Sequence, residues 1–173
     1  DKGKSRIYYT RKVNVFLNIL NFTPEIKDHN GNLRLPSEQK ELAFDGEKVL
    51  ASALTTLNST LFRWFLSTYS DCRNLNKREL TLFPINLNNL TKNHFNELNV
   101  LMSDLMVRLK ETSEIRKMKA GKEDITVQCI IPKHSKDIID KIDTVLAAHY
   151  GFTQKELDFI INYDIKYRMG NSL

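Results

Sequence analysis

The chain has 173 residues, with 26 lysines and arginines against 21 aspartates and glutamates, and 41% of its residues are hydrophobic. A chain of this length can bury a real core as one domain, or as one domain with a helical appendage. Its composition excludes collagen, low-complexity disorder and a disulfide scaffold. No apolar run approaches the roughly 18 residues of a membrane span, and no signal-peptide-like segment follows Asp1. We therefore expect no membrane partner, and we expect the chain to be part of a longer protein.

The N-terminal half combines short strands with one long helix. Residues 6–15 are rich in β-branched and aromatic side chains and predict a strand, and residues 41–44 predict a second one. The Asn-Gly pair within residues 28–32 favours a tight turn. From residue 47 to about 69, apolar residues recur three and four positions apart, which predicts a helix. Residues 58–60, Asn-Ser-Thr, compete for backbone hydrogen bonds and predict a bend, a break or a special contact within it.

The remaining residues predict mainly helices. A polar loop is expected over 70–80, followed by an extended stretch to residue 85, and a second long helix over 92–119 that ends at Gly121. Residues 125–131 predict a short strand. Ser135 then begins a third helix, and the capping-box sequence from Thr153 begins a fourth. The predicted fold class is α+β, with a small mixed sheet in the N-terminal half and a helix-rich C-terminal half of about four helices.

Basic residues are clustered along the chain. Residues 1–12 carry a net charge of +4, residues 63–78 carry +3 and residues 108–122 carry +4, which leaves −6 for all other residues. Such clustering is the pattern expected for a polyanionic partner, and ordinary solvated faces are the alternative. The third cluster ranks below the other two, because cations are favourable at a helix C-terminus without any ligand.

Metal and catalytic motifs are not apparent. Cys72 and Cys129 are isolated thiols, which fit a reducing cytoplasm, and the four histidines lack zinc spacing. The sequence contains no Gly-rich phosphate loop, no GxSxG element and no HExxH element. An acid-x-Lys element typical of nucleases occurs three times, including Glu25/Lys27, but chance predicts about two. We therefore predict no catalytic residue and no metal ligand in this chain, and a nuclease remains the third alternative.

Several segments together resemble one known family. They are residues 57–62 (LNSTLF), 70–80 (SDCRNLNKREL), 83–85 (FPI), 8–12 (YYTRK) and 149–168, which begin HYGFT and end IKYR. This set resembles the C-terminal target-recognition region, of the TaqI-like specificity type, of bacterial adenine-N6 DNA methyltransferases from type II restriction–modification systems. The resemblance covers nearly the whole chain.

The resemblance implies a larger bacterial cytoplasmic enzyme. The parent protein would bind S-adenosylmethionine and methylate adenine in a short DNA site, and it could be fused to an endonuclease. This chain lacks the Asn-Pro-Pro-Tyr motif and the glycine motif of such enzymes. No catalytic or cofactor residue is therefore carried over, and whether the chain itself takes part in catalysis stays open. The implied partners are duplex DNA and an N-terminal methyltransferase domain.

The resemblance also suggests a division of the chain. Residues 1–90 would be the DNA target-recognition portion, residues 91–122 a long spacer or docking helix, and residues 123–173 a C-terminal helical segment. These three parts can also pack as one domain.

The candidate DNA-binding residues lie in two segments. They are Arg6, Tyr8, Arg11, Lys12, Arg73, Asn74, Asn76, Lys77 and Arg78. Arginine and asparagine have the planar bidentate groups that read base edges, and lysine suits phosphate. Asn74 or Asn76 is the best candidate for a base edge and Lys77 for phosphate. Alternatively, the asparagines form turns and one of two adjacent tyrosines, Tyr8 or Tyr9, belongs to the core.

A second function is compatible with the same sequence. The helices could form a protein-interaction module whose basic clusters only keep it soluble. In that case the apolar face of the predicted 92–118 helix would carry a partner, although burial in the core explains that face equally well.

Overall fold

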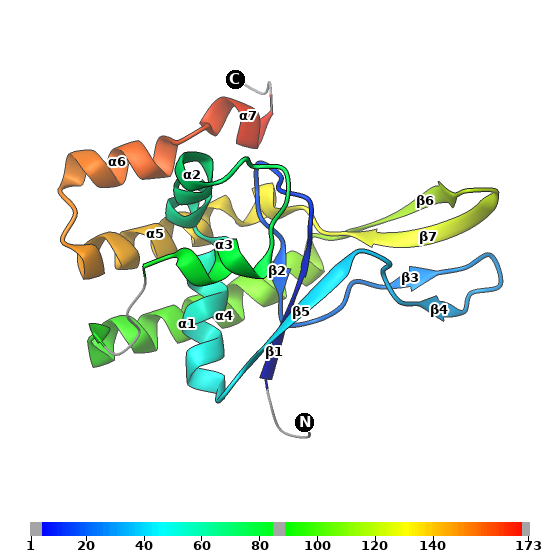
Figure 1. Cartoon of the computed structure of the whole chain (residues 1–173), viewed down its shortest axis with the longest axis horizontal. Coiled ribbons are helices and arrows are strands. Elements are labelled where there is room, and N and C mark those ends of the chain that lie inside the picture. Colours follow the sequence, from blue (N-terminus) through cyan, green and yellow to red (C-terminus); the bar gives the residue numbers. More distant parts are fainter. Residues whose placement is uncertain (1–4, 85–88, 171–173) are drawn as a thin grey trace.

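A computed structural model of the chain describes residues 5–84 and 89–170. Helices gather at one end of the molecule, a small sheet lies beside them, and two β-hairpins project from the other end (Figure 1). In chain order the elements are β1 (Ser5–Thr10), β2 (Ile19–Leu20), β3 (Ile26–Lys27), β4 (Leu33–Arg34), β5 (Gln39–Phe44), α1 (Glu47–Asn58), α2 (Thr60–Tyr69), α3 (Lys77–Leu82), α4 (Lys92–Glu111), β6 (Glu114–Ala120), β7 (Glu123–Cys129), a 3₁₀ turn (Pro132–Ser135), α5 (Lys136–Tyr150), α6 (Gln154–Asn162) and α7 (Ile165–Met169).

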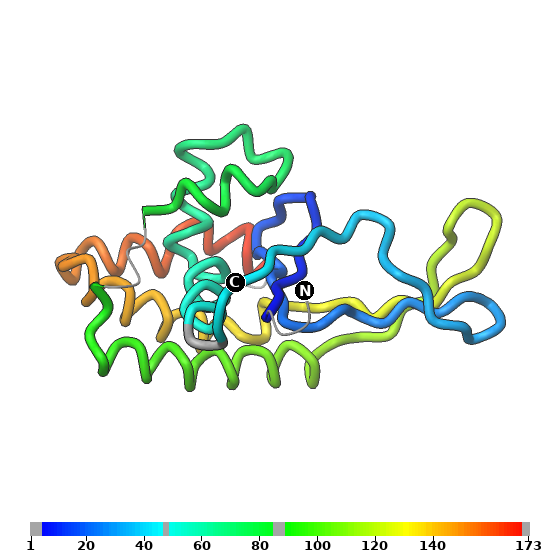
Figure 2. The backbone as a smooth tube through the Cα atoms, turned by 60° about the horizontal axis from the view of Figure 1, so that its bottom comes forward, coloured from blue at the N-terminus to red at the C-terminus, as the bar shows by residue number. Residues whose placement is uncertain are grey.

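The described strands form two antiparallel sheets. One has the order β2-β1-β5 and the other the order β4-β3-β7-β6. The α+β class is thus confirmed, whereas the expectation of one mixed sheet is not. The second sheet also recruits β6 and β7 from the second half of the chain. Figure 2 shows α4 running along the body toward the β6–β7 hairpin.

The core is one apolar cluster between the first sheet and the helices. Its fully buried side chains include Ile7 and Ile19 from the sheet, Phe62 from α2, Leu105 from α4 and Ile142 from α5. The three parts into which the sequence was divided all contribute to this cluster. Their division into separate units stays a prediction.

The expected interruption at residues 58–60 is a break between α1 and α2. The Asn58 carboxamide donates to the Ile19 carbonyl oxygen at 2.7 Å and to the Leu54 carbonyl oxygen at 2.8 Å, and it accepts from the Ile19 N–H at 3.2 Å. Ser59 has extended backbone angles and its hydroxyl accepts from the Phe62 N–H at 3.0 Å, so it is the N-cap of α2. Asn58 therefore ties the end of α1 to β2, while Ser59 begins the next helix.

Asp143 of α5 completes this junction. Its carboxylate accepts from the backbone N–H groups of Thr60 at 3.2 Å and Leu61 at 3.0 Å, and the residue is 1% exposed. Burial raises the pKa of Asp143 to about 6, although these N–H groups and the nearby Arg168 favour the charged form. The buried Arg168 guanidinium also lies 4.4 Å from the centre of the Phe16 ring.

The predicted helix over 92–119 is wrong in its last third. α4 ends at Glu111, where Thr112 caps it by donating from its backbone N–H and its hydroxyl to the Arg108 carbonyl oxygen at 2.9 and 2.8 Å. β6 and β7 then pair over seven residues each, joined by a two-residue turn in which Gly121 has a φ of 65°. A positive φ at the first turn position suits glycine and the right-handed twist of a hairpin.

Two other segments and the number of helices differ from expectation. β1 ends at Thr10 rather than residue 15, and Lys77–Leu82 is the helix α3 rather than a loop leading into an extended stretch. Residue 85 lies outside the described residues. Within the described parts there are seven α-helices rather than about four.

Other local expectations are confirmed. β5 and β7 form where strands were predicted, and the Thr153 N–H donates to the Glu156 carboxylate at 2.7 Å in a capping box. No helix in 5–84 or 89–170 is long and apolar enough to cross a membrane.

Replacing Asn58 should strongly destabilise the fold. In Asn58→Ala the N–H and the carbonyl of Ile19 lose a buried partner, and we expect the free energy of unfolding to fall by about 2–4 kcal/mol. Asn58→Asp keeps an acceptor for the N–H but sets a carboxylate against two carbonyl oxygens, so it should be no better. Urea unfolding followed by the fluorescence of Trp64 measures both. A loss below about 1 kcal/mol in both variants would contradict this role.

The stability of the protein should also depend on the titration of Asp143. Because burial raises its pKa from 3.8 to about 6, folding favours the protonated carboxyl. Protonation of Asp143 therefore contributes at most about 3 kcal/mol to the free energy of unfolding. This contribution is complete below about pH 4 and is lost as the pH rises through about 6. Asp143→Asn removes the titration. The unfolding free energy of the native protein should therefore fall relative to that variant as the pH rises, and a relative gain would refute the assignment.

Candidate nucleic-acid interface

Two of the predicted basic segments lie side by side in the structure. Lys12 forms an isolated antiparallel bridge with Asn74, and the Leu75 N–H donates to the Arg11 carbonyl oxygen at 2.7 Å. Together with the start of β5, these segments line a surface groove of about 280 Å³. We call it the basic groove, and its lining residues are Arg11, Lys12, Ser37, Glu38, Gln39, Lys40 and Asn74.

Local packing holds the loop before α3 against β1. Leu75 is 2% exposed and anchors the loop in the core. Asp71 accepts from the Arg73 N–H at 2.9 Å, which forms a tight turn through Cys72, whose φ is 55°. Asp71 thus contacts the backbone N–H of Arg73 through its carboxylate, and no ion pair between the two side chains is found in the described residues. The neighbouring Asn74 is consequently held at the edge of the groove.

Within the described residues, the cations of the basic groove have no carboxylate partners. Arg11, Lys12 and Lys40 are exposed, and none forms an ion pair within the described residues. Glu38 is the single acid among the lining residues. The groove therefore presents an excess of positive charge to solvent, and it can hold an anion such as a phosphate.

Asn74 and Asn76 have different roles. Asn76 forms a capping box with Glu79 at the start of α3, where the Asn76 N–H donates to the Glu79 carboxylate at 2.9 Å. In the same capping box the Asn76 side chain faces the Glu79 backbone N–H, so it is turned toward its own helix. The Asn74 carboxamide lines the groove and forms no hydrogen bond in the part of the chain that the structure describes. Asn74 is therefore the better placed of the two to read a base edge.

The other candidate residues lie around the groove or away from it. Arg73 is exposed next to Asn74, and Lys77 and Arg78 are exposed in the first turn of α3. Arg6 forms an ion pair with Glu41, which lies on the neighbouring strand β5. The Tyr9 ring is buried on the core side of β1, and burial followed by the charge of Glu79 raises its pKa.

Three residues that line the groove were not among the DNA-binding residues predicted from the sequence, namely Ser37, Gln39 and Lys40. Lys40 reaches it because β5 pairs with β1 in a register that sets Lys40 opposite Tyr9. The pairing joins segments about 30 residues apart, and the positive charge of Lys40 alone does not distinguish it from other surface lysines.

The third basic cluster is divided by the end of α4. Arg108 lies 3.5 Å from the Asp137 carboxylate, and Lys110 lies 4.5 Å from the centre of the Phe22 ring. In the hairpin, Arg116 donates to the Glu114 carboxylate at 2.7 Å. Lys117 and Lys119 are exposed in β6 without ion pairs in the described ranges. This cluster therefore does not form one surface, and we still rank it below the other two as a candidate site for a polyanion.

The nuclease alternative has no assembled metal site among residues 5–84 and 89–170. Glu25 and Lys27 form an ion pair with each other at 2.9 Å. No group of three histidine, cysteine or acidic side chains in the described ranges is arranged to hold a metal ion.

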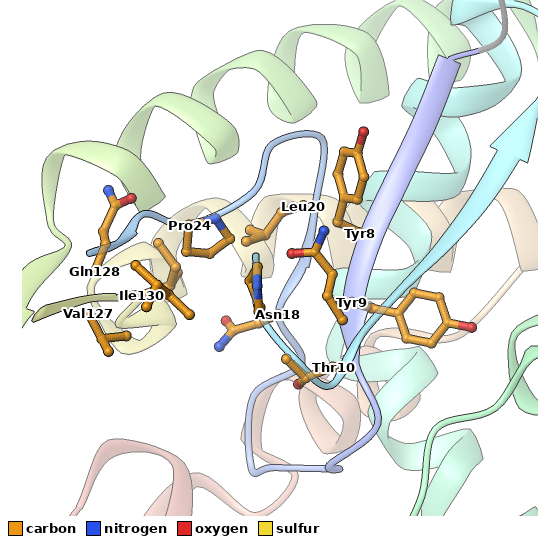
Figure 3. Close-up of a pocket in the computed structure, with 12 residues that line it drawn as sticks. Tyr8, Tyr9, Thr10, Asn18, Leu20, Pro24, Val127, Gln128 and Ile130 are labelled. Carbon is orange, nitrogen blue, oxygen red and sulfur yellow. The ribbon is translucent and has the colours of Figure 1, made fainter. Parts of the chain in front are cut away.

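A second cavity lies between the two sheets, next to the basic groove. This inter-sheet cleft has a volume of about 200 Å³, and its lining includes Tyr8, Asn18, Leu20, Pro24, Val127 and Ile130 (Figure 3). Gln39 lines both the cleft and the groove. The two cavities are therefore adjacent, one mostly apolar and the other basic. Sequence reasoning pointed to Tyr8 here but gave no signal for Asn18.

Comparisons of this chain with protein-family models, with curated proteins and with solved structures found no match. The function proposed below therefore rests on the residues and geometry of the basic groove and its neighbouring cleft.

The different roles of the two asparagines can be separated by mutation. Asn76→Ala should lower the free energy of unfolding by about 1 kcal/mol because it removes a helix cap, and Asn76→Ser should restore most of that loss. Asn74→Ala should change stability by less than about 0.5 kcal/mol, because its side chain has no hydrogen-bond partner among the residues that the structure describes. Thermal and urea unfolding of the three variants test this. An equal loss for Asn74→Ala and Asn76→Ala would contradict the distinction.

Proposed function

We propose that this chain is the sequence-specific DNA recognition region of a bacterial restriction–modification enzyme that methylates adenine in a short DNA site. An N-terminal methyltransferase domain in the same cytoplasmic protein would bind S-adenosylmethionine and carry out the transfer. The observation that carries the proposal is the bridge between Lys12 and Asn74, which joins two separately predicted basic segments at one groove.

The charge of the groove supports a nucleic-acid backbone as the ligand. Arg11, Lys12 and Lys40 face one groove without a carboxylate partner among the described residues. Cations in this state release counterions from DNA when they neutralise phosphates, and this term dominates non-specific affinity. Arg73 and Lys77 extend the charged surface along the loop that leads into α3.

The amide of Asn74 supports sequence reading. A carboxamide can bond both the N6 and N7 positions of adenine in the major groove, and a free one at the edge of a phosphate-binding surface is suitably placed to do so. Arg73, beside it, has the planar fork that pairs with guanine. The cations would thus set the position of the duplex, and these two side chains would discriminate among sequences.

The projecting β6–β7 hairpin is a second element whose form suits contact with DNA. β6 and β7 extend from the body as a hairpin (Figure 1). Because β3 pairs with β7 at Thr126 and Val127, the two-stranded part is the outer segment 118–125, which carries the exposed Lys119. A two-stranded ribbon fits the width of the major groove. We propose that it contacts the same duplex as the basic groove.

A protein-interaction module remains the alternative function. Val100 and Val107 lie seven residues apart on α4 and are 61% and 54% exposed. The methionines expected to serve an interface are less available, because Met106 is buried and Met102 packs against the core. This alternative predicts a stable protein assembly and no DNA binding.

Duplex DNA binding should depend on salt and on Lys12. If Arg11, Lys12, Lys40, Arg73 and Lys77 each neutralise one phosphate, the logarithm of the binding constant should fall against the logarithm of the salt concentration with a slope near −4.5. Lys12→Ala should weaken binding severalfold for all sequences and reduce that slope by about 0.9. Lys141→Ala, an exposed lysine of α5, is the charge-matched control and should change neither value.

Sequence preference should depend on Asn74. Selection from a random duplex library should give a preferred sequence for the native protein, and Asn74→Ala should relax the preference at one base pair by about 1–3 kcal/mol. Binding that is insensitive to salt, or equally weakened by Lys12→Ala and Lys141→Ala, would refute the basic groove as the DNA site.

A further inference from the structure

The inter-sheet cleft is mostly apolar and has room for one aromatic side chain. Its volume is about 200 Å³, and a cavity of about 150 Å³ in another protein accepts benzene. Sites for drug-sized ligands are larger, at about 300–1,000 Å³. Leu20 and Pro24 line the cleft from the β2–β3 region, and Val127 and Ile130 line it from β7 and the segment after it. A protein side chain can enter such a cleft directly, whereas the stacked and paired bases of a duplex cannot.

One polar atom in the lining has no hydrogen-bond partner. The Asn18 Oδ1 atom is buried and accepts no hydrogen bond within the described residues. Figure 3 shows Asn18 among the lining side chains, with Ile130 on one side and Tyr8 on the other. A buried acceptor without a partner is unfavourable, so a ligand that brings a donor is favoured there. Tryptophan is the aromatic side chain with an N–H donor and no acceptor of its own, and it therefore matches the cleft best.

The cleft adjoins the basic groove where β1 and β5 are paired. Thr10 lines the cleft and pairs with Gln39, whose side chain lines both cavities and donates to the Thr23 hydroxyl at 3.0 Å. The groove begins one residue further along the chain, with Arg11 and Lys12. An extended chain advances about 3.3 Å per residue. A peptide whose ring occupies the cleft can therefore bring residues a few positions away to these cations.

The charge of the basic groove favours an acidic ligand. Arg11, Lys12 and Lys40 line it without carboxylate partners among the described residues, and Glu38 is the single acid of its lining. Carboxylates of a ligand would relieve the repulsion among these cations, as phosphates would. The cleft and the groove together thus fit a segment that has an aromatic residue with acidic residues a few positions from it.

We propose that the cleft and the basic groove together bind an acidic segment of a protein partner. The ring of one tryptophan enters the cleft and donates to Asn18 Oδ1, while neighbouring carboxylates lie on Arg11, Lys12 and Lys40. This segment covers cations that the proposed function assigns to DNA, so a bound partner excludes the duplex. That exclusion rests on the proposed function, whereas the binding of the segment does not.

Four short labelled peptides test the proposal. The first, EEGWGEE, has acids on both sides of a tryptophan, so that either direction of the chain can place carboxylates on the groove. The second has alanine in place of the tryptophan, and the third has glutamine in place of every glutamate. The fourth has a naphthyl side chain in place of the indole, which keeps a fused aromatic ring but has no N–H. Fluorescence anisotropy with the native protein measures the affinity for each.

Both the ring and the acids should contribute to binding. We expect EEGWGEE to bind at least about tenfold tighter than the alanine peptide, because burial of one large apolar side chain is worth at least that factor. The glutamine peptide should bind severalfold more weakly than EEGWGEE. Lys12→Ala should weaken the binding of EEGWGEE, and Lys141→Ala should not. Equal affinity for the tryptophan and alanine peptides, or for the glutamate and glutamine peptides, would overturn the proposal.

Variants of the cleft locate the ring. Thr10→Trp sets a large side chain at an exposed residue of the cleft lining, on a strand that tolerates aromatic residues, and it should abolish the preference for tryptophan over alanine. Thr144→Trp makes the same change at an exposed position of α5, outside both cavities, and should keep that preference. A preference that Thr10→Trp leaves intact would place the ring elsewhere and would refute the cleft as its site.

The hydrogen bond to Asn18 is tested by pairing a protein variant with a peptide variant. The native protein should bind the tryptophan peptide severalfold tighter than the naphthyl peptide, and Asn18→Ala, which adds no bulk, should bind the two equally. This comparison remains informative if Thr10→Trp does not fold. A preference for the indole that persists in Asn18→Ala would contradict the bond.

Competition with DNA separates the two proposals. Unlabelled EEGWGEE should displace labelled duplex DNA at a lower concentration than the alanine peptide does. If duplex binding depends on Lys12 but the protein does not distinguish the peptides, the DNA site stands and the partner site is refuted. If the tryptophan peptide binds through the cleft and no duplex binding depends on Lys12, the partner site stands and the proposed function fails. Binding of both ligands without displacement would refute their exclusion.

Discussion

Two buried side chains, Asn58 and Asp143, bond backbone groups around the junction where α1 ends and α2 begins. Asn58 bonds both the N–H and the carbonyl of Ile19, and Asp143 accepts from two N–H groups at the start of α2. Each of these groups would cost about 1–3 kcal/mol if it were buried without a partner. The junction thus links β2, α1, α2 and α5. The Leu-Asn-Ser-Thr segment, which contributes to the resemblance to DNA specificity regions, has a structural role in this chain.

The position of the candidate site depends on that junction. Ile19, which Asn58 holds, pairs with Tyr9 in the first sheet, and Tyr9 lies two residues before Arg11. The short strand β2, which pairs with β1 just before Arg11, is thus tied to the end of α1 by a residue 39 positions from Ile19. Asn18, beside Ile19, lines the inter-sheet cleft. A change at the junction would disturb the groove and the cleft together, so variants intended to test binding have to leave it intact.

The sequence was sufficient to predict structural features that depend on residues close together in the chain. The capping box at Thr153 and the break near Asn58 both follow from side chains that bond backbone groups close in sequence. The hairpin was missed because Ile115 and Met118 are spaced like a helix face, although both are exposed. The Asn-x-x-Glu pattern from Asn76 was a readable start signal for α3. The place of Lys40 in the groove was not readable, because it depends on strand register.

The cations of the basic groove differ from other basic residues of the chain in their ion pairing. Arg34, Arg108 and Arg116 each have a carboxylate within 4 Å, whereas no such partner is found in the described residues for Arg11 and Lys12. Gathering unpaired like charges around one groove raises the electrostatic free energy of the isolated chain, because like charges repel. An anion in the groove would relieve that repulsion. The same exposed cations contribute little to folding, so this surface can be optimised for a polyanion without loss of stability, while the buried junction keeps the fold.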